Sequence, residues 1–355
     1  GGKRNVLSLH ICSVIITTRM EALIIIGYLV LAGALVYLSI LLSNYVDMLD
    51  KTTKISGAIL GGVLLAAVTS LPELFTTLTA VVGVGEYGYV LGNILGSDIF
   101  DIIVLAVLLV IFIKNVHKAK IGKSNYIQFI ILLAMYVVII LAVMLPENIK
   151  KYFTIGGCFN ALAILLLAFY VISLFVMDKT EVKEESNEQI KYTTKQIIIR
   201  FAICSVLLIG CSIGVTFMSD MIVQRFEIDP TAAGATLLGI MTSLPEVIST
   251  FNLFYKKNLN AGAGNMIGSA VFNMIIIFLS ELVSFNGSVF TQTPEVNKLI
   301  ILGIISIVAC FVALLFKLMG KKENCKNLSL VLVAIFSIIS FAGYVLYLVL
   351  PNSLF

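Results

Sequence analysis

Two glutamates lie beside prolines in the middle of long apolar stretches. The sequence Thr-Ser-Leu-Pro-Glu occurs twice, ending at Glu73 and at Glu246. A carboxylate in a membrane-length apolar segment is costly, and such residues usually mark the path of an ion or polar substrate. Each proline removes a main-chain donor and bends its helix, which frees nearby carbonyl oxygens. Carboxylates, hydroxyls and freed carbonyls are the hard oxygen ligands that suit Ca²⁺ or Na⁺.

A second matched block follows each copy. Residues 92–101 have the sequence Gly-Asn-Ile-Leu-Gly-Ser-Asp-Ile-Phe-Asp, and residues 264–273 have Gly-Asn-Met-Ile-Gly-Ser-Ala-Val-Phe-Asn. Glycines four residues apart predict close helix packing, which would bring these blocks near the glutamates. In each block a serine precedes the last acid or amide by four residues, so both side chains lie on one helix face. The four residues are Ser97, Asp101, Ser269 and Asn273.

Composition predicts an all-α integral membrane protein. Apolar residues make up 59% of the chain and charged residues 12%, against about 25% charged in soluble domains. Windows of about 20 apolar residues predict ten transmembrane helices. Their expected bounds are 22–43, 56–83, 89–113, 126–145, 154–177, 196–219, 232–255, 262–285, 299–316 and 328–350.

Lysine and arginine are distributed unevenly between the expected loops. The loops after odd-numbered spans hold 16 of these residues, whereas the termini and the loops after even-numbered spans hold 7. Because basic residues collect on the cytoplasmic side, we expect both termini outside and the polar 178–195 linker in the cytoplasm. A prokaryotic cell membrane is the expected location.

The two motif copies are expected to cross the membrane in opposite directions. Glu73 and Glu246 are 173 residues apart, and five spans separate the second helix from the seventh. An odd number of crossings predicts an inverted repeat, with the ion site near the midplane between the halves. We divide the chain into an N-terminal extension or cloning remnant (1–19), a first five-helix half (20–177, with repeat 56–113), the linker (178–195) and a second half (196–355, with repeat 232–285).

The paired motifs resemble the alpha-repeats of the cation/calcium exchanger superfamily. The Ser-Leu-Pro-Glu form is similar to the prokaryotic sodium/calcium exchanger branch, since the proton-coupled branch typically has Gly-Asn-x-x-Glu in its first motif. The resemblance implies ten helices in two inverted halves, with Glu73 and Glu246 as shared Ca²⁺ and Na⁺ ligands. It further implies carbonyl ligands from Thr69 and Thr242, flanking Na⁺ sites lined by Ser70, Ser97, Ser243 and Ser269, and a cluster completed by Asp101 and Asn273.

This chain departs from the family pattern at two positions. A common prokaryotic pattern has Asn in the first repeat and Asp in the second, where this chain has Asp101 and Asn273. Position 98 is often Asn and is Asp here, so Asp98 is a candidate fourth carboxylate.

Charge indicates antiport without the resemblance. Glu73, Asp101 and Glu246 carry −3 when all are ionised, so one Ca²⁺ leaves −1, whereas several Na⁺ can neutralise the cluster. Ions that share the same carboxylates must compete, which favours exchange by alternating access.

Several alternatives stay open or are disfavoured. Grouped carboxylates in a low dielectric can hold protons, so a Ca²⁺/H⁺ exchanger of the same fold is the main alternative. An enzyme is disfavoured because the two histidines, His10 and His117, lie at the terminus and in a loop. A channel is disfavoured because midplane motifs in both halves suit alternating access better.

For Glu281, near the end of the eighth span, we expect a helix-end or snorkelling role. We expect no cofactor and no nucleic-acid partner, only the lipid bilayer, Ca²⁺ and Na⁺ or H⁺.

Overall fold

The computed structural model describes residues 2–85, 87–119, 121–155, 159–177, 192–226, 242–285, 287–319 and 326–349. Seven helices of these residues are long and apolar enough to cross a membrane, and two shorter apolar helices accompany them. The protein is therefore an all-helical integral membrane protein. Most of the expected linker (178–191) and the start of the second repeat (232–241) lie outside the described residues.

The first half begins with one long helix, α1, which includes most of the expected N-terminal extension. The second expected span is broken into short segments, two of them π-helical. The elements are α1 (Gly2–Thr52), α2 (Gly57–Ile59), η1 (Leu60–Leu65), α3 (Ala66–Thr69), α4 (Leu71–Thr79), η2 (Ala80–Val84), α5 (Tyr87–Ile111), α6 (Ile113–Lys118), α7 (Lys123–Met144), α8 (Glu147–Phe153), β1 (Thr154–Ile155), β2 (Phe159–Asn160) and α9 (Ala163–Val176).

Five helices of the second half are described. Its described elements are α10 (Thr194–Phe226), α13 (Leu244–Tyr255), α14 (Leu259–Leu282), α15 (Pro294–Met319) and α16 (Lys326–Val349). The helix α13 is the described part of the seventh expected span.

The prediction of a helix from 154 onward is wrong. Strands β1 and β2 pair antiparallel, with Thr154 opposite Asn160, and α9 begins only at Ala163. The Asn160 side-chain oxygen accepts a hydrogen bond from the Leu162 N–H at 3.0 Å, which holds the chain in a turn just before the helix. Apolar composition alone cannot predict such a short strand pair.

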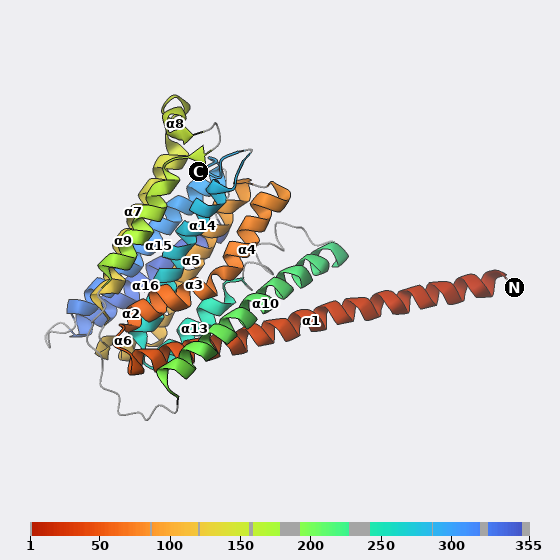
Figure 1. Cartoon of the computed structure of the whole chain (residues 1–355), viewed down its shortest axis with the longest axis horizontal. Coiled ribbons are helices and arrows are strands. Elements are labelled where there is room, and N and C mark those ends of the chain that lie inside the picture. The colour runs from red at the N-terminus through yellow and green to blue at the C-terminus, as the bar shows by residue number, and fades with distance from the viewer. Residues whose placement is uncertain are drawn as a thin grey trace.

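The helices form two packing groups. Helices α1 and α10 lie side by side and share one apolar cluster, which also includes Leu60 and Leu65 of η1 and Leu253 of α13 (Figure 1). Helices α5, α7, α14 and α15 carry the larger cluster. The short helices around the two Ser-Leu-Pro-Glu motifs therefore lie where the two groups meet.

Close backbone packing occurs where α14 crosses η1. A Cβ on Gly268 would collide with the Gly62 backbone, and one on Gly61 would collide with the Ala261 carbonyl. The predicted role of the α14 glycines is thus confirmed. The α5 glycines differ, because a Cβ on Gly92 or Gly96 would meet no described atom within 4 Å.

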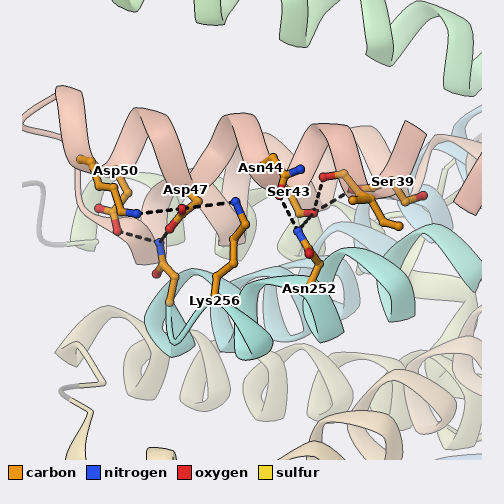
Figure 2. A network of polar contacts seen from close by, with 10 residues as sticks. Ser39, Ser43, Asn44, Asp47, Asp50, Asn252 and Lys256 are labelled. Atoms are coloured by element: carbon orange, nitrogen blue, oxygen red, sulfur yellow. Dashed lines mark hydrogen bonds and ion pairs between the residues drawn. The ribbon is translucent and has the colours of Figure 1, made fainter. Parts of the chain in front are cut away.

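A polar network joins α1 to α13 at the end of the bundle that holds residues 50 and 256 (Figure 2). The amide of Asn252 donates to Ser43 Oγ and Asn44 Oδ1, each at 2.8 Å. Near the helix ends, Asp47 forms ion pairs with Lys51 at 3.1 Å and with Lys256 at 3.7 Å. This network links α1 to α13 through polar side chains.

Replacing Asn252 with Ala should destabilise the protein, because Ser43 and Asn44 each lose the hydrogen bond that Asn252 donates in a partly buried interface. We expect a loss of about 1–3 kcal/mol in unfolding free energy, measured as a lower melting temperature in detergent. Thr79 occupies the matching position in the first repeat, where its exposed hydroxyl bonds only the Phe75 carbonyl of its own helix. Thr79→Ala is the control and should change stability by less than about 0.5 kcal/mol. Equal effects of the two substitutions would contradict this role.

Candidate ion-binding site

In both proline motifs a helix begins directly after the serine, with similar serine backbone angles. Ser70 separates α3 from α4 with φ −87° and ψ 4°, and Ser243 precedes α13 with φ −85° and ψ −1°. A serine at a helix start normally caps its own helix, but neither hydroxyl does so here. The two hydroxyls are thus available for other partners, and each glutamate lies in the first turn of the helix that follows.

The two hydroxyls bond across the halves. Ser70 donates to Glu246 Oε1 at 3.1 Å, and Ser243 donates to Glu73 Oε1 at 3.3 Å. Each serine of the motif pairs with a serine of the second block, Ser70 with Ser269 at 2.7 Å and Ser243 with Ser97 at 3.2 Å. A hydroxyl has one proton, so Ser70 and Ser243 accept from these partners while they donate to the glutamates.

Four carboxylates are buried in this region. Glu73, Asp98, Asp101 and Glu246 are at most 2% exposed. Within the described residues, no lysine or arginine forms a salt bridge with them. Each of the four has at least one oxygen without a hydrogen-bond partner among the described residues, and in Asp101 both oxygens have none. Buried carboxylates of this kind require a compensating positive charge, which a bound cation or proton can supply.

The predicted pair Asp101 and Asn273 is buried, but its members do not bond each other. The Asn273 amide donates to Asp98 Oδ1 at 2.9 Å instead, and its own Oδ1 has no partner. The candidate fourth carboxylate, Asp98, is therefore connected to the predicted cluster through Asn273.

The two threonines of the motifs are buried beside the glutamates. The Thr69 hydroxyl turns back to the carbonyls of Leu65 and Ala66, at 3.1 and 3.3 Å, so that it is engaged within its own helix. No three acidic, histidine or cysteine side chains of the described residues converge closely enough to hold an ion by themselves. Any ion must therefore take hydroxyl, amide or main-chain oxygens as well.

Sequence reasoning missed a second symmetric pair of contacts. Asn93 donates to Thr77 Oγ1 at 3.2 Å, and Asn265 donates to Thr250 Oγ1 at 2.9 Å. Asn265 also donates to the carbonyl of Glu246 at 3.3 Å. These contacts could have been predicted from the repeat. Both asparagines follow the first glycine of their block, and both threonines lie four residues after a motif glutamate.

Glu281 has a structural role at the end of α14, and the snorkelling expectation is wrong. The side chain is 1% exposed. Its carboxylate accepts from the N–H groups of Asn160 and Val289, at 2.6 and 2.8 Å, and from the Ser288 hydroxyl at 2.9 Å. These donors come from strand β2 and from the loop after α14. Glu281 therefore holds both of these segments against the end of α14.

A model of the family described as sodium/calcium exchanger protein matches residues 23–177 and again residues 197–351. The chain belongs to this family. The two matched segments correspond to the two halves that carry the motif copies. Members of the sodium/calcium exchanger family are cation transporters, so the buried carboxylates lie in a transport protein.

The chain is also similar to individual membrane proteins. An uncharacterized membrane protein of Methanocaldococcus jannaschii, MJ0091, is 31% identical over 82% of this chain and 90% of its own length. The inner membrane protein YrbG of Escherichia coli is 24% identical over 70% of this chain and 78% of its own. A structure of the sodium-calcium exchanger NCX_Mj soaked with 2.5 mM Na⁺ and 0.1 mM Sr²⁺ has 21% identity, a TM-score of 0.63, and coverage of 92% of this chain and 100% of its own. The last comparison shows a shared fold.

Replacing Glu281 with Ala should lower stability, because the N–H groups of Asn160 and Val289 lose their acceptor in a buried place. We expect a loss of about 2–5 kcal/mol in unfolding free energy, seen as a lower melting temperature in detergent. Glu281→Gln retains one acceptor oxygen and should lose less. An Ala variant as stable as the parent would contradict the structural role.

Proposed function

We propose that this protein is a secondary active antiporter that exchanges Na⁺ for Ca²⁺ at one shared site near the midplane of the membrane. The sodium/calcium exchanger family supports the reaction class. The observation that carries the proposal is the group of four buried carboxylates with unpartnered oxygens and no basic partner among the described residues.

The proposed ligands are the side chains and carbonyls that the two motifs contribute. Glu73 and Glu246 are the central ligands of Ca²⁺ and Na⁺, and Asp101 adds a third charge. The remaining proposed ligands are the carbonyls of Thr69 and Thr242, the hydroxyls of Ser70, Ser97, Ser243 and Ser269, and the amide oxygen of Asn273.

Charge balance favours mutually exclusive binding. With Asp98 the group carries up to −4, so one Ca²⁺ leaves −2, and several Na⁺ together neutralise more of the charge than one Ca²⁺ does. Both ions depend on the same glutamates, and therefore one must leave before the other binds. Alternating access of such a site to the two sides of the membrane produces exchange.

The inverted arrangement of ten helices is part of the proposal. Matching junctions at Ser70 and Ser243, and hydrogen bonds from each to the other half's glutamate, support two equivalent units that face one another. We place the protein in a prokaryotic cell membrane, with the 178–195 segment in the cytoplasm.

The coupling ion is tested by flux in reconstituted vesicles loaded with Ca²⁺. An inward Na⁺ gradient should drive Ca²⁺ efflux, and a pH gradient without Na⁺ should not. Efflux driven by the pH gradient alone would replace Na⁺ with H⁺ as the coupling ion. Absence of efflux under both gradients would contradict the exchange function.

Replacing Glu73 or Glu246 with Gln should reduce Na⁺-driven Ca²⁺ efflux by at least about tenfold, because removing one charged partner of a buried ion contact typically costs about 3–5 kcal/mol. Glu281→Gln is the control, since it removes a buried carboxylate outside the site and should retain efflux. Robust efflux by either motif variant would exclude a shared carboxylate site.

The membrane orientation is tested by cysteine labelling in a protein without other reactive thiols. Because basic residues favour the cytoplasmic side, Ser186→Cys should react from the cytoplasmic side and Ser353→Cys from outside. Reaction of both from one side would contradict the inverted repeat as well as the orientation.

A further inference from the structure

The hydrogen bond between Asn273 and Asp98 joins the two halves beside the ion cluster. Asn273 Nδ2 lies 2.9 Å from Asp98 Oδ1, and both side chains are fully buried. The position in the second repeat that matches Asp98 is Ala270, so this polar contact has no symmetric copy. The two repeats therefore differ at this point of the cluster.

The contact shows which way the amide points. Asn273 donates through its NH₂ group to an oxygen of Asp98, so the NH₂ group faces Asp98. The amide oxygen then points away from Asp98, and it is buried without a partner. Asn273 follows Ser269 by four residues on one face of α14, and Ser269 bonds Ser70 of the first motif. The free oxygen therefore belongs to the helix face that borders the cluster.

An amide is useful to a cation only through its oxygen, since its NH₂ group would repel the ion. If Asp98 were absent, either end of the amide could face the cluster. We propose that Asp98 is a positioning residue that holds Asn273 with its carbonyl oxygen toward the cations, an inference that rests on the proposed exchange function.

Asp101 is not part of this pair. Neither of its carboxylate oxygens has a hydrogen-bond partner among the described residues, so it is available to contribute charge separately.

A double-mutant cycle tests this pairing by Na⁺-driven Ca²⁺ efflux from vesicles. Asn273→Asp places two carboxylates against each other and should reduce efflux by roughly tenfold or more. Asp98→Asn removes the fixed orientation and should reduce efflux by roughly threefold to tenfold. The double variant Asp98→Asn/Asn273→Asp restores one donor and one acceptor, so its efflux should recover to within roughly threefold of the parent.

The matched control is Asn125→Asp, which creates a carboxylate at another fully buried amide, on α7, where Asn125 donates to Asn260. Asp98→Asn should rescue Asn273→Asp and should not rescue Asn125→Asp. A double variant no better than its worse single variant, or equal rescue of Asn125→Asp, would overturn the proposal.

Melting temperatures of the same four proteins in detergent give a readout that does not depend on transport. Both single variants should melt lower than the parent, and the double variant should recover most of the loss. If the parent protein transported no Ca²⁺ under either a Na⁺ or a pH gradient, the proposed exchange function would be wrong. The melting temperatures would still show whether Asp98 and Asn273 interact. Strictly additive losses in melting temperature would show that positions 98 and 273 do not interact.

Discussion

The structure depends on two crossed hydrogen bonds, from Ser70 to Glu246 and from Ser243 to Glu73. Each glutamate is oriented by a serine from the other motif, and each serine is free to do this because it does not cap its own helix. The crossed contacts therefore depend on how α4 and α13 begin at the two proline motifs. A change in the position of one half must alter the carboxylate that the other half presents.

Burial of the carboxylates makes this arrangement sensitive to charge. Four acidic side chains at most 2% exposed, with no described basic partner, are costly unless cations or protons compensate them. Stability of the folded protein is thus linked to occupancy of the site, since a ligand that binds the folded state stabilises it. The short and π-helical segments around Glu73 suit such a site, because π-helical turns occur frequently where function requires irregular backbone.

Much of this site could be predicted from sequence, because the motifs repeat and the cost of a carboxylate in an apolar span is large. The predicted serines do lie near one another, although their pairing of Ser70 with Ser269 and of Ser243 with Ser97 was not foreseen, and the α14 glycines pack closely as expected. The partner of Asn273 could not be predicted, since spacing places a residue on a helix face without saying which neighbour it meets. The pairing of β1 with β2 and the burial of Glu281 were also not predicted: the Asn160 N–H donates to Glu281, which is 121 residues away in the chain, and apolar composition cannot reveal such a contact. Whether the full chain forms ten inverted spans stays a prediction.

The central claim is that Ca²⁺ and Na⁺ occupy the same carboxylates in turn. Equilibrium binding of radioactive Ca²⁺ to the purified protein, repeated at increasing Na⁺ concentration with ionic strength held constant by choline, tests it directly. The account predicts that Na⁺ raises the apparent dissociation constant for Ca²⁺ steeply, with more than one Na⁺ displacing each Ca²⁺ and the maximum number of Ca²⁺ sites unchanged. Binding of Ca²⁺ that is unaffected by Na⁺ would contradict it.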